Sequence, residues 1–130
     1  MNAPSKDIQA MLVADTAVDT DAFPIERGSL QEDAPNCTGI FDVPSGAPQL
    51  TMDRAAYEFP SIQIKVRCAD YDTGWAYITS IKDSLHGRAN EQWNGTLYTL
   101  VQCLNGPGAM GKENQRTIFV VNFNLQRRLP

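Results

Sequence analysis

The sequence contains little of what enzymes use for catalysis. Its 130 residues include one histidine, His86, and three cysteines that lie far apart, Cys37, Cys68 and Cys103. No CxxC, HxH or HExxH spacing occurs, so the usual patterns of zinc ligands are missing. His86 falls in the last turn of a predicted helix, where the helix dipole alone favours a histidine. These gaps predict a protein that is not an enzyme and that carries no cofactor and no metal.

The chain also lacks long apolar runs and a strong excess of either charge. No run approaches the roughly 20 apolar residues that cross a bilayer, and residues 1–7 do not resemble a secretory signal. A net charge of −4 gives the surface as a whole no attraction for nucleic acid. An odd number of distant cysteines favours buried thiols in a reducing cytosol over a disulfide plus a free thiol. Because the sequence has no membrane-spanning run, we expect no membrane partner.

The remaining composition is that of an ordinary globular protein. Hydrophobic residues make up 42% of the chain and charged residues 20%, which argues against disorder. A chain of 130 residues is long enough for one domain and short for two. We expect a single domain over residues 1–130.

Apolar periodicity divides the chain into helices and strands. A helix is expected over residues 5–15, with Ser5 as its N-cap. A second helix is expected over about residues 71–86, between the capping side chains at Asp70–Thr73 and a C-terminal Gly87. Strands are expected over residues 22–27, 37–43, 61–68, 96–103 and 117–127.

These elements predict a helix-covered sheet. The strand over residues 61–68 alternates apolar and polar side chains, so one of its faces is buried. The helix over residues 71–86 carries an apolar stripe that begins at Trp75 and should cover this face. After a tight turn at Asn94-Gly95, the last two strands flank a glycine-rich loop over residues 105–115 and should pair as a hairpin. The order α-β-β-β-α-β-β indicates an α+β fold, a mainly antiparallel sheet of about five strands with two helices packed on one face.

Positive charge gathers at one place in this arrangement. Lys65 and Arg67 lie on one strand, and Arg116, Arg127 and Arg128 lie on or beside another. If the two strands are neighbours, these residues form a polar, basic face of the sheet. Such a face is either solvated or meets another subunit or passing DNA. Aromatic residues are not interleaved with the basic positions, which disfavours stacking on single-stranded nucleic acid.

Several segments follow one another in an informative order: Tyr57–Pro60, Ile62–Arg67, Leu85–Gly87, Gly95–Tyr98, a glycine-rich hairpin loop and Phe119–Arg128. Their order and spacing resemble the phage minor capsid or tail-completion family, related to the tail terminator proteins of long-tailed (siphovirus-like) bacteriophages. The resemblance extends over residues 5–128 and is weakest in the acidic stretch over residues 15–33.

The resemblance implies a structural virion protein. Terminators of this type form a homo-hexameric ring that ends the tail tube and joins the tail to the head. The implied partners are further copies of the chain, the tail tube protein and a neck or stopper (head-completion) protein, with DNA passing only transiently through the lumen. The implied location is the tail-neck region of the virion, after assembly in the host cytoplasm.

Two parts of the chain are candidates for contact with these partners. A glycine-rich loop can become ordered on a partner surface, and the basic strand face can lie beside it. The candidate interface residues are Gln63, Lys65, Arg67, Gly106, Gly108, Met110, Gly111, Lys112, Arg116, Arg127 and Arg128. Two other functions remain open, another neck component (a head-closure, stopper or adaptor protein) and a small monomeric host-directed binding module. Oligomeric state separates the monomeric module from the ring.

Overall fold

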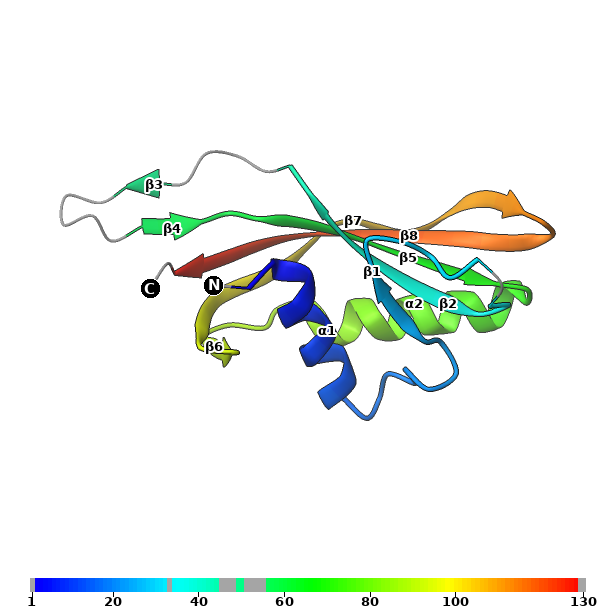
Figure 1. The fold of residues 1–130 in the computed structure, drawn as a ribbon, viewed down its shortest axis with the longest axis horizontal. Coiled ribbons are helices and arrows are strands. Elements are labelled where there is room, and N and C mark those ends of the chain that lie inside the picture. Colours follow the sequence, from blue (N-terminus) through cyan, green and yellow to red (C-terminus); the bar gives the residue numbers. More distant parts are fainter. Residues whose placement is uncertain (1, 33, 45–48, 51–55, 129–130) are drawn as a thin grey trace.

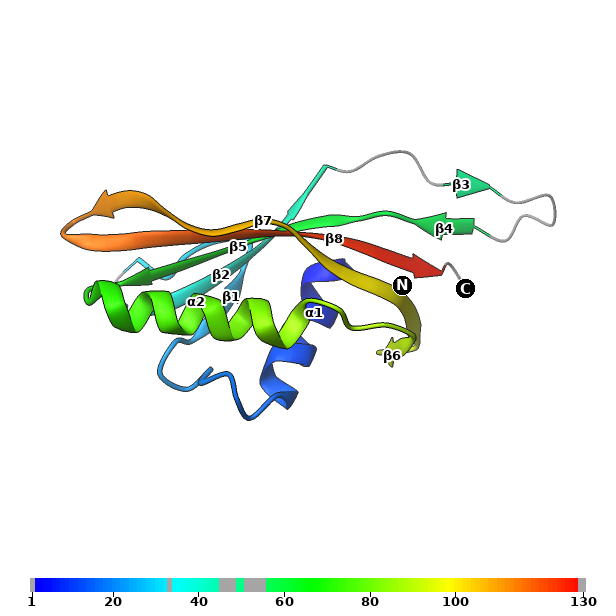
Figure 2. The same ribbon diagram turned by 180° about the vertical axis from the view of Figure 1, so that it is seen from behind.

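Two helices cover one face of an eight-stranded sheet (Figures 1 and 2). The computed structural model describes residues 2–32, 34–44, 49–50 and 56–128, and all counts of elements refer to these ranges. The helices are α1 (Pro4–Ala14) and α2 (Tyr71–Leu85). The strands are β1 (Ile25–Arg27), β2 (Cys37–Val43), β3 (Gln49–Leu50), β4 (Ala56–Glu58), β5 (Ser61–Cys68), β6 (Glu91–Trp93), β7 (Thr96–Glu113) and β8 (Arg116–Arg128).

The sheet is mixed and larger than the sequence predicts. Its strands follow the order β1-β2-β5-β8-β4-β3, and β7 also pairs with β8 and with β6. β1 runs parallel to β2, whereas the other described pairs are antiparallel. The α+β class is confirmed, but the predicted five-stranded, mainly antiparallel sheet and the order α-β-β-β-α-β-β are wrong. The three unpredicted strands, β3, β4 and β6, have only two or three residues each, too few to show a period of two.

The last two strands form a hairpin that is longer than predicted. β7 runs through the expected loop at residues 105–115 and ends only at Glu113. Its pairing with β8 shifts register at several points between Tyr98 and Gly111, so bulges absorb the glycines that suggested a loop. The turn itself is Asn114-Gln115, and both residues have positive φ angles, 49° and 63°. The prediction of a hairpin is confirmed, and the prediction of a long glycine loop is wrong.

The core lies between the sheet and the helices. The predicted alternation of β5 is confirmed, with Ile62, Ile64 and Val66 fully buried. Helix α2 packs against this face and buries Ile78 and Ile81. Burial of each such side chain is worth about 1.5–3 kcal/mol. Trp75, predicted to begin the buried stripe, is 41% exposed.

Gly74 of α2 lies in close contact with β5 and β8. A Cβ atom at this residue would lie 2.4 Å from Cε2 of Phe119 and 2.9 Å from Cβ of Cys68. Any larger residue would therefore push the first turn of the helix away from β5 and β8. The helix begins where expected, because the Asp70 side chain accepts a hydrogen bond of 3.1 Å from the backbone N–H of Thr73.

Helix α1 begins differently from the prediction. Ala3 is the N-cap and Pro4 is the first helical residue, a position where proline costs no hydrogen bond. Ser5 lies inside the helix, where its hydroxyl donates to Oδ2 of Asp42 at 2.7 Å and its backbone N–H to Oδ1 at 2.9 Å. Ser5 therefore attaches α1 to the end of β2 instead of capping the helix.

The three cysteines are free thiols. Cys37 and Cys68 are buried, as expected, and Cys103 is half-buried. Burial raises the pKa of the Cys37 and Cys103 thiols, which disfavours the reactive thiolate form.

Candidate interaction surfaces

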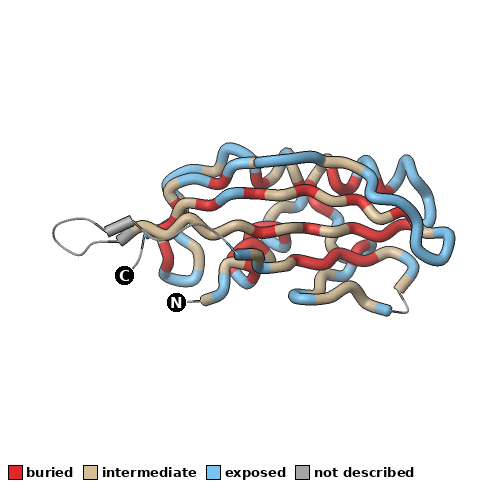
Figure 3. The backbone as a smooth tube through the Cα atoms, turned by 90° about the horizontal axis from the view of Figure 1, so that it is seen from above, coloured by how far each residue is buried: buried red, intermediate tan, exposed pale blue. Residues whose placement is uncertain are grey.

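Neither of the two described helices lies on the second face of the sheet (Figure 1). We call it the open face, and Figure 3 looks onto it. Along β8, fully or nearly buried residues point to the helices, while Ile118, Val120, Asn122 and Asn124 alternate with them and point the other way. In β5, Gln63 and Lys65 share the open face. A sheet face with no helix on it is the natural place for a partner surface.

The basic part of the open face is smaller than predicted. β5 and β8 are neighbours, as the prediction required, but Arg67 is buried and donates hydrogen bonds to the backbone carbonyls of Gln31, Glu32 and Ala34. Arg116 also donates to the carbonyl of Ala34, at 3.4 Å. These two guanidinium groups hold the segment before β2 against the sheet.

The other predicted basic residues are spread apart. The Nζ atom of Lys65 lies 5.4 Å from the ring centroid of Phe41, a cation–π distance. Arg128 is exposed at the opposite end of β8. Arg127 points to the helix side and is buried. A continuous basic face is therefore absent from the described residues, because β8 places Arg127 and Arg128 on opposite faces.

The middle of the open face is polar and uncharged. Gln63 of β5 pairs with Asn122 of β8, and Asn124 of β8 pairs with Gln102 of β7. The Ser61 hydroxyl donates to Oδ1 of Asn124 at 2.9 Å. Amide side chains both donate and accept hydrogen bonds, so this region can pair with the backbone of a partner without ionic contacts.

A shallow hollow opens beside these amides. Its volume is about 300 Å³, and its lining consists of Phe59, Ser61, Leu100, Gln102, Asn124, Leu125 and Gln126. All of these residues are uncharged, and Leu100 is 38% exposed. A second hollow of about 260 Å³ lies near the turn of the β7–β8 hairpin and is lined by Leu30, Lys65, Met110, Gly111, Lys112, Glu113 and Ile118.

The turn of the β7–β8 hairpin lies at one end of the sheet, just past α2 (Figures 1 and 2). In the half of β7 that leads to this turn, the predicted interface residues Gly106, Met110, Gly111 and Lys112 are exposed, and Gly108 is half-exposed. Met110 is 59% exposed. The structure thus brings these five residues together on one strand, separate from Arg127 and Arg128.

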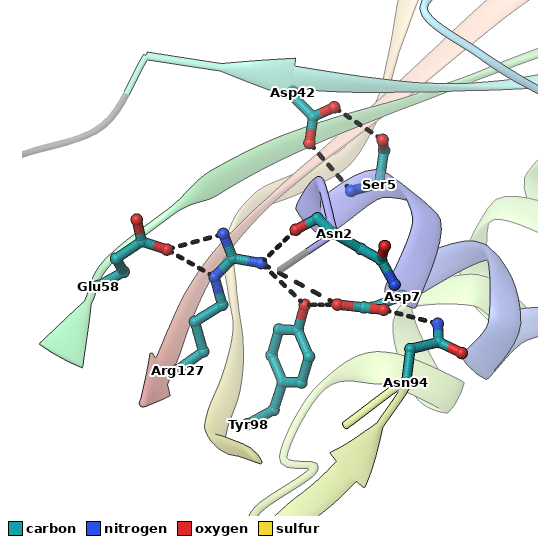
Figure 4. A network of polar contacts seen from close by, with 8 residues as sticks. All are labelled: Asn2, Ser5, Asp7, Asp42, Glu58, Asn94, Tyr98 and Arg127. Carbon is teal, nitrogen blue, oxygen red and sulfur yellow. Dashed lines mark hydrogen bonds and ion pairs between the residues drawn. The ribbon is translucent and has the colours of Figure 1, made fainter. Parts of the chain in front are cut away.

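A buried polar network on the helix side had no signal in the sequence (Figure 4). Nη2 of Arg127 lies 2.7 Å from Oε2 of Glu58, and Nη1 donates to the backbone carbonyl of Asn2 at 2.9 Å. The fully buried Asp7 carboxylate accepts hydrogen bonds from the hydroxyl of Tyr98 and, at 2.7 Å, from Nδ2 of Asn94.

This network holds the N-terminus against the last strand. Burial raises the pKa of Tyr98, and its hydrogen bond to Asp7 raises it further. Tyr98 therefore remains a hydrogen-bond donor to the carboxylate. The members lie as far apart as Asp7 and Arg127, so only the folded chain brings them together.

His86, predicted in the last turn of a helix, lies at the C-terminal end of α2. This residue is the C-cap of α2, and its Nδ1 atom accepts a hydrogen bond of 2.9 Å from the backbone N–H of Cys103. In the described part of the chain, no three His, Cys, Asp or Glu residues are placed to hold a metal ion. No helix in the same ranges is long and apolar enough to span a membrane.

Comparison with known proteins decides the family. The family model described as "Bacteriophage tail terminator protein" matches residues 15–128. The chain belongs to the bacteriophage tail terminator family. The match includes the acidic stretch over residues 15–33, where the resemblance of the sequence was weakest. As a member of this family, the protein is a structural component of the phage tail and not an enzyme.

The fold of this terminator family member also occurs in solved structures. One match is a chain from a structure titled "Virion of native gene transfer agent (GTA) particle", with a TM-score of 0.74 and 16% sequence identity. The alignment covers 98% of this chain and 96% of the other, so the two chains share their fold nearly from end to end. No curated protein matches the sequence.

Proposed function

We propose that this terminator family member forms a homo-hexameric ring that ends the tail tube and joins the tail to the head or neck. The family match over residues 15–128 carries the proposal. A closed ring needs a heterologous interface, in which two different patches of each subunit meet. The chain has suitable elements at opposite ends of its sheet, the β3–β4 pair and the turn of the β7–β8 hairpin (Figure 1).

The ring has three kinds of partner. Other copies of the chain lie on either side of each subunit, the tail tube protein lies below, and a neck or stopper protein lies above. DNA crosses the lumen only in transit, and the net charge of −4 opposes lasting attachment. The protein acts in the tail-neck region after assembly in the host cytoplasm, as a single domain over residues 1–130.

Exposure divides the candidate interface residues into two groups. Most are exposed or half-exposed and stay candidates for contact: Gln63, Lys65, Gly106, Gly108, Met110, Gly111, Lys112, Arg116 and Arg128. Arg67 and Arg127 are buried on internal partners. Their burial favours a role in positioning the segments that they bind over direct contact with another subunit.

The mass of the purified protein tests the ring. Light scattering of the protein alone should give six times the 14.4 kDa of one chain, or the mass of one chain that leaves the free fraction when assembled tail tubes are added. Antibody labelling of negatively stained virions should then place the protein at the head-proximal end of the tail. A monomer that does not bind tail tubes would favour a host-directed binding module. A ring located on the head side of the head–tail joint would favour another neck component.

A further inference from the structure

The hollow bounded by Phe59 and Leu100 suits an apolar side chain carried on an extended backbone. Its apolar walls can enclose a methylene chain, and the amides of Gln102, Asn124 and Gln126 beside them can bind backbone N–H and C=O groups. A charged side chain would lose its hydration here without gaining an ionic partner, because every lining residue is uncharged.

The β7–β8 hairpin carries a group with these properties. Met110 is 59% exposed, and its flexible thioether chain adapts to irregular hollows. It stands between Gly108 and Gly111, at each of which an added Cβ would meet no atom within 4 Å. Neither glycine carries a side chain, so the backbone around Met110 can approach another surface closely.

This part of β7 also offers backbone groups. The outer edge of β7 pairs with β6 at Thr96–Tyr98, and Thr99, Val101 and Cys103 bond to residues 86–90. Beyond Cys103, no described residue pairs with this outer edge. Such an edge binds another chain readily, and the amides of the hollow provide the matching donors and acceptors.

Met110 cannot reach the hollow of its own chain. Met110 and the hollow both lie on the open face. Met110 lines the second hollow together with Lys65 and Ile118, which point to this face. Leu100, which lines the first hollow, pairs with Gln126 of β8. Along β8, Leu100 lies opposite Gln126, and Gly111, the neighbour of Met110, lies opposite Ile118. These two positions of β8 are eight residues apart, or about 26 Å at 3.3 Å per residue. A Met110 side chain that fills the hollow must therefore come from another molecule.

We infer that the hollow at Phe59 and Leu100 receives Met110 from the β7–β8 hairpin of a second copy of this chain. The inference rests on the proposed ring and names its subunit contact. In the proposed ring each copy gives Met110 to one neighbour and receives Met110 from the other, whereas a two-fold pair would exchange Met110 reciprocally and stop at a dimer. This head-to-tail contact closes into a ring when the rotation between copies allows it.

Cysteine cross-linking of the full chain tests the contact. Cys103→Ser removes the half-buried thiol, while Cys37 and Cys68 are protected by burial. In this background, Met110→Cys and Leu100→Cys are made separately, mixed with or without tail tubes, and treated with copper–phenanthroline. The mixture should form a covalent dimer, and each variant alone should give at least tenfold less. A chain that carries both cysteines should give a ladder of covalent multiples.

The controls separate this inference from the ring itself. Val13 is 60% exposed on α1, so Val13→Cys mixed with Leu100→Cys should stay monomeric on the gel. A hexamer by light scattering without the Met110–Leu100 cross-link overturns the named contact and leaves the ring standing. Strong cross-linking of Met110→Cys alone also overturns it, because that result indicates a two-fold interface. A chain that stays monomeric with and without tail tubes overturns both the contact and the ring.

Discussion

Arg127 is the residue that joins the most distant parts of this chain. Its guanidinium binds Glu58 at the base of β4, the backbone of Asn2 ahead of α1, and the hydroxyl of Tyr98 on β7. Tyr98 in turn donates to the buried Asp7. A buried carboxylate is tolerated only where charges and hydrogen bonds compensate for lost hydration. The position of α1 therefore depends on a residue at the other end of the sequence.

Replacing Arg127 with Met should destabilise the fold strongly. The Met side chain fills similar space, but Glu58 loses its ion pair and the buried Asp7 loses its nearby cation. Breaking a buried pair in this way costs about 3 kcal/mol or more. Urea unfolding measures the loss. The matched control is Arg128→Met on the exposed side of the strand, which should change stability by no more than about 0.5 kcal/mol. Equal effects of the two changes would show that the network contributes nothing.

Tyr77 makes the stability of the fold depend on pH in the alkaline range. Its ring stacks on Phe23 with centroids 3.9 Å apart, and its oxygen accepts a hydrogen bond from Thr38. Burial raises the pKa of Tyr77 to about 12, against roughly 10 in an unfolded chain. Between these values the unfolded state loses the proton first. The contribution of Tyr77 to the free energy of unfolding is therefore complete below pH 10 and is lost as pH rises toward 12.

The replacement Tyr77→Phe removes this titration. From pH 9 to pH 11, the stability advantage of the native chain over the variant should shrink by roughly 1 kcal/mol, since one pKa unit corresponds to about 1.4 kcal/mol. Urea unfolding at the two pH values measures it. Tyr98 titrates in both proteins and cancels in the comparison. Parallel stability curves would mean that Tyr77 ionises as readily in the folded chain as in the unfolded one.

At the scale of elements, predictability follows the strength of the local pattern. The strands over residues 37–43 and 61–68 and the helix opened by Asp70 could be read from the sequence, because alternation and capping are local signals. The course of β7 could not, since its glycines and Pro107 indicate a loop. Pairing with β8 outweighs that local preference.

The candidate site divides in the same way. Exposure of the residues around Met110 could be predicted from their composition. Burial of Arg67 could not, because it depends on hydrogen bonds to the backbone carbonyls of Gln31, Glu32 and Ala34. The residues next to Arg67 in the sequence give no sign of these distant contacts.

Two tight turns with asparagine in first place provide a test of turn chemistry. Asn94-Gly95 and Asn114-Gln115 both have two successive positive φ angles, but only the first has glycine in second place. A non-glycine residue in this conformation costs about 1 kcal/mol, so Gln115→Gly should stabilise the chain by roughly 0.5–1 kcal/mol. Thermal unfolding measures the gain. Glu113→Gly, within β7, should instead be destabilising. A loss of stability in both variants would show that the Asn114-Gln115 turn is not strained.

At the scale of the whole molecule, the family match and the folded unit have different limits. The match begins at residue 15, after the end of α1. The helix is nevertheless part of the core, because Ile8, Met11 and Leu12 are fully buried and Asp7 lies in the polar network. The structure from the gene transfer agent particle aligns with 98% of the chain, so the shared fold is larger than the shared sequence pattern. We conclude that α1 completes the domain.

Removal of residues 1–14 should therefore unfold the protein. Loss of three buried apolar side chains, each worth about 1.5–3 kcal/mol, approaches the 5–15 kcal/mol that stabilises an ordinary domain. The chain over residues 15–130 should be insoluble or should melt without a cooperative transition. Two variants of the full chain grade the effect: Ile8→Ala should cost about 2–5 kcal/mol, and Val13→Ala, on the exposed side of α1, no more than about 0.5 kcal/mol. A shortened chain with an unchanged melting temperature would make α1 an appendage, and Asp7 and Arg127 would then have no structural reason to be buried.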